Sequence, residues 1–158
     1  MVTVHLFTYG TLTLPEVMQA VTGQIFPAMD ALLPGYERFC VVDQLYPGMI
    51  RTGHQSTLGR IYFNIDPVSL DRLDYFEGDL YIRQAVTVIL PEHSTLYADT
   101  YVVPPSHRNQ LSQNSWSADQ FRSLHLPQFL VQVHHWMDEY AGNSSPTTEE
   151  PDTWYLEP

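Results

Sequence analysis

The sequence predicts an α+β domain built on a mostly antiparallel sheet or small barrel. Several segments have the β-branched and aromatic content of strands, one short helix is expected between two of them, and the C-terminal third is helical in pattern. The chain has 158 residues, which is the size of one domain. We expect a single domain over residues 1–140 and an acidic, mobile tail over 141–158. Periodicity leaves open whether the sheet closes.

The chain begins with a strand, a turn and a helix. Residues 2–7 form the first expected strand, which breaks at the tetrapeptide YGTL over residues 9–12. Residues 15–21 are expected to form a short helix, with Pro15 in its first turn and Gly23 at its end.

The next segments are expected to be strands and turns. Strands are predicted over residues 28–33 and 38–42, with a turn at Pro34-Gly35 between them. A second turn, LYPGMIRTG over residues 45–53, leads to a strand over residues 58–65 that is rich in Ile, Tyr and Phe.

A helix with clear start and stop signals comes after this strand. Asp66 has the character of an N-cap and Pro67 that of the first helical residue. Apolar residues recur at helical spacing until Gly78 ends the helix, at Leu70, Leu73 and Phe76. This arrangement puts Glu77 at the end of a helix, directly before a strand.

A hairpin and a helical region complete the prediction. Residues 81–90 are the most strand-like segment, and residues 96–103 are expected to return beside it. Ser117, with Gln120 three residues later, has the form of a capping box. It opens a helical region toward Tyr140 that Pro127 is expected to kink or split.

The charge of the chain argues against several classes of partner. The formal net charge is −11, from 18 acidic and 7 basic residues, and the chain contains no lysine. Nucleic acids and anionic membranes are therefore not expected as partners, because both require a cluster of Lys and Arg. The oligomeric state is left open.

The single cysteine and the N-terminal segment indicate a cytoplasmic protein. Cys40 is the only cysteine, so an internal disulfide is impossible, which fits a reducing compartment. The stretch MVTVHLFTYG has no basic start or long apolar run, and about 18 consecutive apolar residues occur nowhere. Export and membrane spanning are not expected.

Four motifs in sequence order resemble a known family. They are FTYGTL at 7–12, LYPGMI at 45–50, GRIYFNI at 59–65 and LDRLDYFEGDLYIRQAVTV at 70–88. Each is weak alone, but their order and spacing are similar to those of the gamma-glutamylcyclotransferase-like superfamily. The likeness is strong over residues 4–103, and the continuation from YADTYVV at 97–103 is similar to the branch of gamma-glutamylamine cyclotransferases and avirulence-induced-gene-like proteins.

The resemblance implies a fold and a site. It implies a small antiparallel barrel flanked by helices, with a cavity at one end. It also implies that the backbone of residues 9–12 lines this cavity and that Glu77 is the catalytic acid/base. Thr11 stands where the family usually has Ser, a change that keeps the hydroxyl group.

Glu77 has two interpretations from the residues alone. It is either a solvated residue at a helix end, or a base whose pKa is raised by the apolar surroundings of Tyr75, Phe76 and Tyr81. The pentapeptide alone favours the first interpretation, and the resemblance favours the second. Gly78 would allow the backbone to turn after it.

The YGTL turn likewise has two interpretations. It is either a tight turn that needs Gly10 for its dihedral angles, or a set of backbone N–H groups that bind the α-carboxylate of a substrate. The expected substrate-binding residues are Tyr9, Gly10, Thr11, Leu12, Tyr46 and Tyr81.

Other polar and aromatic residues receive structural interpretations. Arg83 is expected to form an ion pair with Asp74 or Asp79 rather than to bind a ligand. Three aromatic residues either close the cavity or belong to the core, and the core is favoured: Trp116, Phe121 and Phe129.

The seven histidines do not form a metal-binding pattern. The sequence has no HExxH motif, and Pro127 lies between His125 and His134. No metal and no cofactor are expected, and a metal hydrolase is the weakest of the functions considered.

The expected function is therefore that of a cyclotransferase. Such an enzyme, of the acyltransferase or lyase type, releases 5-oxoproline and an amine from a γ-glutamyl-amine or γ-glutamyl peptide. The alternative is a non-catalytic module that binds a small molecule on the same fold. The sequence does not identify the leaving amine.

Overall fold

The computed structural model describes residues 2–143 of the chain. The elements in chain order are β1 (Val4–Thr8), the 3-10 turn η1 (Thr11–Thr13), α1 (Pro15–Thr22), β2 (Ala28–Cys40), β3 (Pro47–Ile65), α2 (Pro67–Glu77), β4 (Ile82–Ile89), β5 (Thr95–Val102), the 3-10 turn η2 (Pro105–Gln110), α3 (Ala118–Leu124) and α4 (Leu126–Asn143). Residues 141–143 end α4, and the rest of the expected tail lies outside the described residues.

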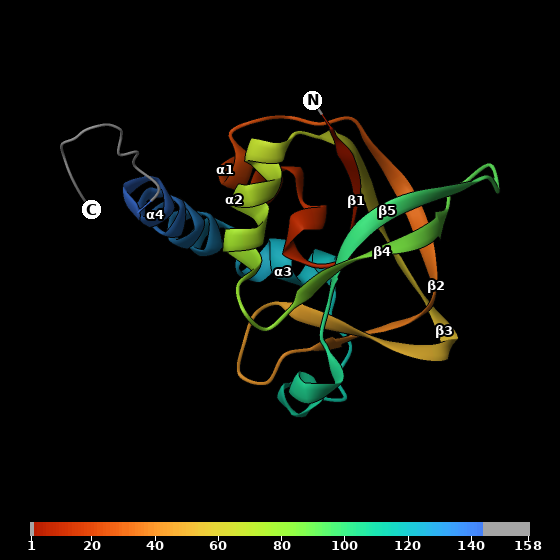
Figure 1. Cartoon of the computed structure of the whole chain (residues 1–158). Coiled ribbons are helices and arrows are strands. Elements are labelled where there is room, and N and C mark those ends of the chain that lie inside the picture. The colour runs from red at the N-terminus through yellow and green to blue at the C-terminus, as the bar shows by residue number, and fades with distance from the viewer. Residues whose placement is uncertain (1, 144–158) are drawn as a thin grey trace.

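The strands form a closed barrel in the order β1-β3-β2-β4-β5. Strand β1 pairs in parallel with β5, whereas the other neighbours are antiparallel. The helices gather on one side of the barrel, with α4 outermost (Figure 1). The predicted α+β class, the antiparallel character and the flanking helices are confirmed, and the question of closure is answered.

Two predicted turns are wrong, because sheet pairing overrides local turn signals. Strand β2 continues through Pro34-Gly35, where the register shifts and Gly35 has a φ of 87°. A bulge accommodates a proline without N–H and a glycine at positive φ while the strand goes on. Likewise, most of the predicted turn at 45–53 belongs to β3, which pairs Pro47 with Cys40 and Arg51 with Tyr36.

The helices begin and end where the sequence signals predict. The Asp66 carboxylate accepts a hydrogen bond from the Ser69 N–H at 3.0 Å, and Gly23 ends α1 in the left-handed conformation. Ser117 caps α3 by accepting from the Gln120 N–H. The predicted break near Pro127 is confirmed, since α3 ends at Leu124 and α4 begins at Leu126.

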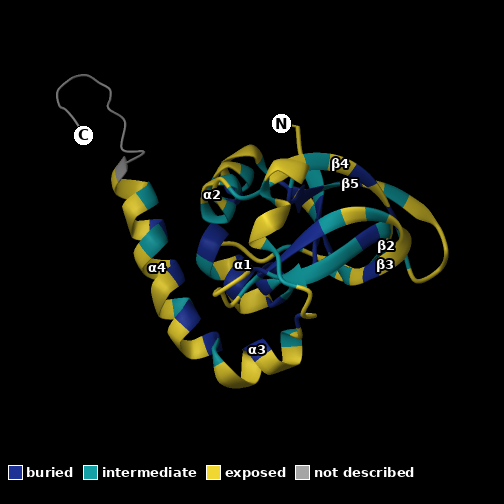
Figure 2. Ribbon diagram, turned by 90° about the horizontal axis from the view of Figure 1, so that it is seen from below, coloured by how far each residue is buried: buried dark blue, intermediate teal, exposed yellow. Residues whose placement is uncertain are grey.

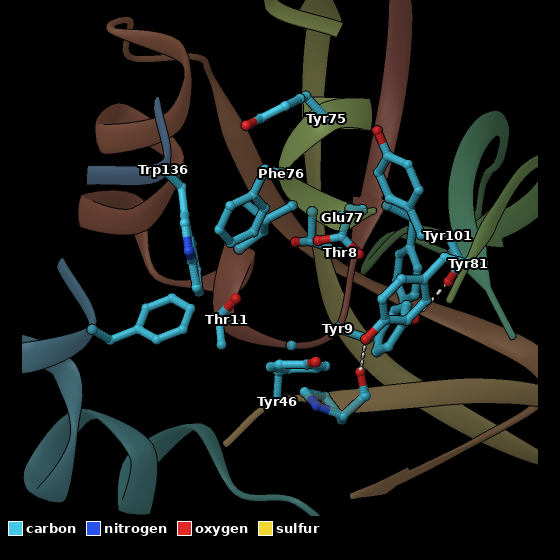
Figure 3. A pocket seen from close by; sticks show the side chains of 15 residues that line it. Thr8, Tyr9, Thr11, Tyr46, Tyr75, Phe76, Glu77, Tyr81, Tyr101 and Trp136 are labelled. Carbon is cyan, nitrogen blue, oxygen red and sulfur yellow. Dashed lines mark hydrogen bonds between the residues drawn. The ribbon is translucent and has the colours of Figure 1, made fainter. Parts of the chain in front are cut away.

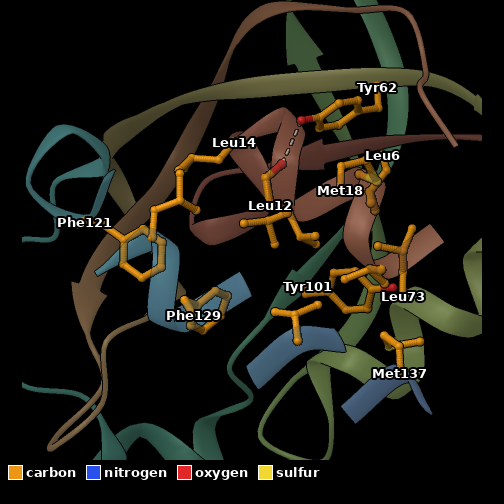
Figure 4. Close-up of a cluster of buried hydrophobic side chains, with 14 of the residues drawn as sticks. Leu6, Leu12, Leu14, Met18, Tyr62, Leu73, Tyr101, Phe121, Phe129 and Met137 are labelled. Carbon is orange, nitrogen blue, oxygen red and sulfur yellow. Dashed lines mark hydrogen bonds between the residues drawn. The ribbon is translucent and has the colours of Figure 1, made fainter. Parts of the chain in front are cut away.

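Two hydrophobic clusters hold the domain together. One fills the barrel, with Phe7, Leu33, Met49 and Ile61 among its most buried members. The other joins the barrel wall to the helices and is drawn in Figure 4. Helix α4 contributes a buried stripe to it, while its other side is exposed (Figure 2). The predicted core residues Trp116, Phe121 and Phe129 are all less than 10% exposed, at 8%, 2% and 6%.

Candidate active site

A cavity of about 290 Å³ opens between the barrel and the helices. Its wall takes residues from both hydrophobic clusters, so it lies where barrel and helices meet. Figure 3 shows the side chains that line it. The lining residues are Phe7, Thr8, Tyr9, Gly10, Thr11, Leu12, Tyr46, Pro47, Tyr75, Phe76, Glu77, Tyr81, Tyr101, Phe129 and Trp136.

Glu77 is held at the cavity by the ends of helix α2. The capped start at Asp66 fixes the helix, and Leu73, which is fully buried, anchors one face of it. The helix then ends at Gly78, whose φ of 76° favours glycine. As the last helical residue, Glu77 directs its side chain into the cavity beside Thr8 (Figure 3).

The carboxyl group of Glu77 has a shifted pKa and no partner. Burial, with a smaller contribution from the negative charge of Asp74, raises the pKa of Glu77 to about 8. Within residues 2–143, no hydrogen bond or ion pair reaches this carboxyl group. A carboxyl group in this state exchanges a proton near neutral pH and is free to meet a ligand.

Asp74, one turn earlier on α2, has hydrogen-bond donors at both oxygens of its carboxylate. Its carboxylate accepts from Arg83 Nε at 2.9 Å and from the Tyr101 hydroxyl at 2.7 Å. Arg83 also reaches Asp99 at 2.6 Å. The predicted ion pair of Arg83 with Asp74 is confirmed. Asp99 is a second partner, which was not predicted.

The four residues of the YGTL turn line the cavity. Its first hydrogen bond runs from the Thr13 N–H to the Gly10 carbonyl at 3.0 Å. Among residues 2–143, the N–H groups of Gly10, Thr11 and Leu12 have no acceptor. Arg38 donates to the Tyr9 carbonyl at 2.7 Å and holds the peptide that precedes the turn.

Gly10 lies in close contact with Pro47, which leaves no room for a side chain. Its φ is −124° and its ψ is −135°. A Cβ atom at this position would lie 2.8 Å from both Cγ and Cδ of Pro47. The approach of the loop before β3 thus gives a steric reason for glycine at this position, in addition to the dihedral angles expected from the sequence.

Four of the five tyrosines that line the cavity fall into two groups. The hydroxyls of Tyr9, Tyr81 and Tyr101 donate to the Tyr101 carbonyl, the Pro47 carbonyl and Asp74, respectively. Burial raises the pKa of each of these three phenols, so they stay neutral. Among the described residues, the hydroxyl of Tyr46 has no hydrogen-bond partner, and burial raises its pKa as well.

The structure brings the predicted site residues together. Glu77, the four residues of the YGTL turn, Tyr46 and Tyr81 all line the one cavity. The three aromatic residues expected around Glu77 line it too, although Tyr75 is 40% exposed and its hydroxyl points away (Figure 3).

Sequence reasoning missed part of the wall. The residues it did not assign to the site are Phe7, Thr8, Pro47, Tyr101 and Trp136. For Phe129 it weighed the cavity against the core and favoured the core, and Phe129 belongs to both. Trp136 is distant from the motifs in sequence, and Tyr101 lies in the stretch YADTYVV, to which no site role was assigned. The closeness of Asp74 to Glu77 did have a local signal, because residues three apart on a helix are neighbours.

The described residues contain no further site of the kinds considered. No group of three or more His, Cys, Asp or Glu within residues 2–143 is arranged to hold a metal ion. Over the same range, no helix is both long and apolar enough to cross a membrane.

Comparisons with known proteins agree with this architecture. AIG2-like protein D of Arabidopsis thaliana is 30% identical over 141 residues, covering 87% of this chain and 92% of the relative. A solution structure from Arabidopsis thaliana has a TM-score of 0.66 at 20% identity, covering 96% of this chain and 97% of that one. A gamma-glutamyl cyclotransferase structure has a TM-score of 0.59 at 14% identity, covering 84% and 86%.

The two similar structures support the fold alone, whereas the sequence matches support membership of a family. The model of the family described as gamma-glutamyl cyclotransferase, AIG2-like, matches residues 6–118. This span includes the YGTL turn, Tyr46, Glu77 and Tyr101, and it ends at Ala118, the first residue of α3, before α4 begins. The chain belongs to the gamma-glutamyl cyclotransferase, AIG2-like family.

Proposed function

We propose that the protein is a gamma-glutamyl cyclotransferase that converts a γ-glutamyl-amine or γ-glutamyl peptide into 5-oxoproline and a free amine. The observation that carries the proposal is the unpaired carboxyl group of Glu77, with its pKa near 8, in the same cavity as the unused N–H groups of the YGTL turn. Membership of the family supports the reaction class.

In this reaction the substrate attacks itself. The α-nitrogen of the γ-glutamyl group bonds to its own γ-carbonyl carbon, and the bond from that carbon to the leaving nitrogen then breaks. Two protons leave the α-nitrogen and two arrive at the leaving nitrogen, so the overall proton count balances. Because nucleophile and electrophile belong to one molecule, the protein mainly folds the substrate, moves protons and holds the oxyanion.

Glu77 is the residue proposed to move these protons. As a carboxylate it accepts each proton from the α-nitrogen and returns it to the leaving nitrogen, ending in its starting state. An ordinary glutamate, with a pKa of about 4.3, is a weak base for an ammonium. Burial against the cavity wall brings the pKa of Glu77 close to neutrality, where it both accepts and donates protons.

The remaining polar groups are proposed to hold the substrate. The N–H groups of Gly10, Thr11 and Leu12 are suited to the α-carboxylate, and Arg38 fixes the turn that carries them. The Tyr46 hydroxyl is available to donate to the oxyanion. Tyr81 acts as a wall residue, since its hydroxyl is committed to Pro47. These steps require no cofactor or metal ion.

Product analysis tests the proposal. The purified protein is incubated with a panel of γ-glutamyl-amines and γ-glutamyl-amino acids, and 5-oxoproline and the released amine are quantified by mass spectrometry. We expect equal amounts of both products from at least one substrate, and loss of both in Glu77→Gln. Glu92→Gln is the matched control, because Glu92 is exposed in the β4–β5 hairpin. Binding without any product would favour the alternative of a non-catalytic binding module.

A further inference from the structure

Three aromatic rings form one side of the cavity. Phe129 and Trp136 lie seven residues apart on α4, which places them on the same face of that helix. Phe76 of α2 completes the group. The ring centroids are 6.3 Å apart for Phe76 and Phe129, 6.0 Å for Phe129 and Trp136, and 6.3 Å for Phe76 and Trp136. We call these three residues the aromatic wall.

The aromatic wall lies across the cavity from the barrel tyrosines. In Figure 3, Trp136 and Phe76 stand on the helical side of Glu77, and Tyr81 and Tyr101 stand on the barrel side. If the γ-glutamyl group occupies the YGTL turn and Glu77, as proposed above, the substituent of the leaving amine extends to one of these sides. The barrel side is filled by phenols that hydrogen-bond to the protein, so the aromatic wall is the side left for the amine.

No positive charge accompanies the aromatic wall. None of the described residues that line the cavity is Arg, Lys or His. Met1 and residues 144–158, which lie outside the described range, contain no basic side chain either. A leaving group that carries a carboxylate would therefore lose its hydration at this wall without gaining an ionic partner. This argues against amino acids and peptides as leaving groups.

The arrangement of the rings favours an apolar group over a cation. The planes of Phe76 and Phe129 meet at 85°, and those of Phe129 and Trp136 at 82°. Rings that pack edge-to-face with one another make a continuous apolar surface. A site for a cation instead directs several ring faces at one point.

The aromatic wall is fixed by packing and is supplied largely by the chain beyond the family match. Val133 and Met137 of α4 are buried, at 0% and 4% exposure, and α4 contacts α1 and α2. Phe129 and Trp136 lie outside the matched residues 6–118. Two of the three rings of the aromatic wall thus come from a segment distant in sequence from Glu77, whereas Phe76 directly precedes it.

We propose that the aromatic wall is the subsite for the leaving amine and that it selects amines with an aromatic or branched apolar substituent and no carboxylate. The inference rests on the proposed function for the identity of the γ-glutamyl half. It adds the chemical class of the other half, a γ-glutamyl-arylalkylamine being its simplest example.

Four synthetic ligands separate the possibilities. They are γ-glutamyl-phenethylamide, γ-glutamyl-phenylalanine, γ-glutamyl-methylamide and mono-γ-glutamyl-1,5-diaminopentane. The second differs from the first by one carboxylate, the third lacks the ring, and the fourth replaces it by a cation. Affinities are measured by calorimetry in the Glu77→Gln protein, so that turnover does not consume the ligand, and product formation is measured in the unmodified protein.

We expect γ-glutamyl-phenethylamide to bind about 10- to 100-fold more tightly than the methylamide, as burial of one ring implies, and more tightly than the other two ligands. Trp136→Ala, added to Glu77→Gln, should reduce the preference for phenethylamide over methylamide about tenfold. Val131→Ala is the control on the same helix, because Val131 is 72% exposed, and it should keep the preference. Thermal denaturation checks that each variant is folded.

Several results would overturn the inference. Equal or tighter binding of the phenylalanine or diaminopentane ligand would do so, as would an unchanged preference in Trp136→Ala, or failure of all four ligands to bind. Preferential binding of the phenethylamide with no 5-oxoproline from the unmodified protein would support the subsite and contradict the proposed catalysis. Failure of the two proposals is therefore distinguishable.

Discussion

Asp74 and Glu77 lie one turn apart at the end of α2, and their carboxyl groups have opposite surroundings. Asp74 is bound by Arg83 and by the Tyr101 hydroxyl, at 2.9 and 2.7 Å. Glu77 has no partner among the described residues, and its pKa is raised to about 8. The same helix thus supplies one carboxylate that is already satisfied and one that is left for a ligand.

The difference shows how a small domain separates a structural acid from a reactive one. Arg83 pairs with Asp74 and Asp99 and does not contact Glu77. Positive charge is therefore held one turn away from the site, while the charge of Asp74 adds to the rise in the pKa of Glu77. In a chain with only seven basic residues, the placement of each arginine affects the acids beside it.

The largest expected effect is a difference in turnover between variants of Glu77 and Asp74. Glu77→Gln should lower kcat by about 10²- to 10⁴-fold, the usual contribution of a general acid/base, because an amide cannot accept the proton. Asp74→Asn should retain most of the turnover. The measurement is 5-oxoproline formation in both variants, with circular dichroism to confirm folding. Undiminished turnover in Glu77→Gln would exclude Glu77 as the base.

The next largest effect is on the affinity for the γ-glutamyl ligand. Gly10→Val should weaken γ-glutamyl ligand binding by at least about tenfold, because its Cβ would lie 2.8 Å from Pro47 and push the YGTL turn away. Thr11→Ser keeps the backbone and the hydroxyl and should retain binding. Calorimetry on both variants measures this. Equal affinities in two folded proteins would mean that the YGTL turn has no role in recognition.

The third effect is on stability and arises from the raised pKa of Glu77. Between about pH 4.5 and pH 8, the unfolded glutamate is ionised while the folded one keeps its proton. Unfolding then releases a proton, so the free energy of unfolding falls as the pH rises through this interval and levels off above about pH 8. The loss should be roughly 2–4 kcal/mol after allowance for solvent screening.

Glu77→Gln provides the comparison for this pH effect. Glutamine does not titrate, so the variant should lack the decrease and be more stable than the unmodified protein at pH 9. Below about pH 4.5 the two should be equally stable. Urea denaturation at pH 4, 7 and 9 measures the differences. Parallel pH profiles for the two proteins would mean that Glu77 has an ordinary pKa.

Local signals predicted the fold class and the helix ends, whereas the residues that line the cavity were predicted through the resemblance of four motifs to a family. The N-cap at Asp66 and the end of α2 at Gly78 are each read from a few neighbouring residues. The two wrong turns, at Pro34-Gly35 and over residues 45–53, failed for the opposite reason. There a long antiparallel ladder between β2 and β3 decides the backbone, and ladder pairing is not encoded within either turn.

The grouping of Phe129 and Trp136 with Phe76, and the contact of Tyr101 with Asp74, were missed on similar grounds. Phe129 and Trp136 have the spacing of any buried helix face, and they reach the cavity only because α4 folds back against α2. Tyr101 reaches Asp74 only because β5 completes the barrel beside β1. Contacts between segments far apart in the chain left no local pattern from which these roles could have been derived.

The smallest expected effect tests whether Asp74 contributes to the state of Glu77. Asp74→Asn removes a negative charge that raises the pKa of Glu77, so that pKa should fall and the rise of kcat/KM with pH should move to lower pH. Release of Arg83 from Asp74 acts in the same direction, because it frees a positive charge nearby. The pair is partly exposed, so the cost in stability should be about 1–2 kcal/mol.

Asp79→Asn is the control for this shift. Asp79 is exposed and comes directly after Gly78, so the substitution removes an equal charge at a similar sequence distance from Glu77 without breaking the contacts of Asp74. Its pH profile should match that of the unmodified protein. The readouts are kcat/KM against pH and the titration of the Glu77 carboxyl carbon by NMR. If Asp74→Asn and Asp79→Asn shift the profile equally, the effect belongs to net charge, and the specific influence of Asp74 on its neighbour is refuted.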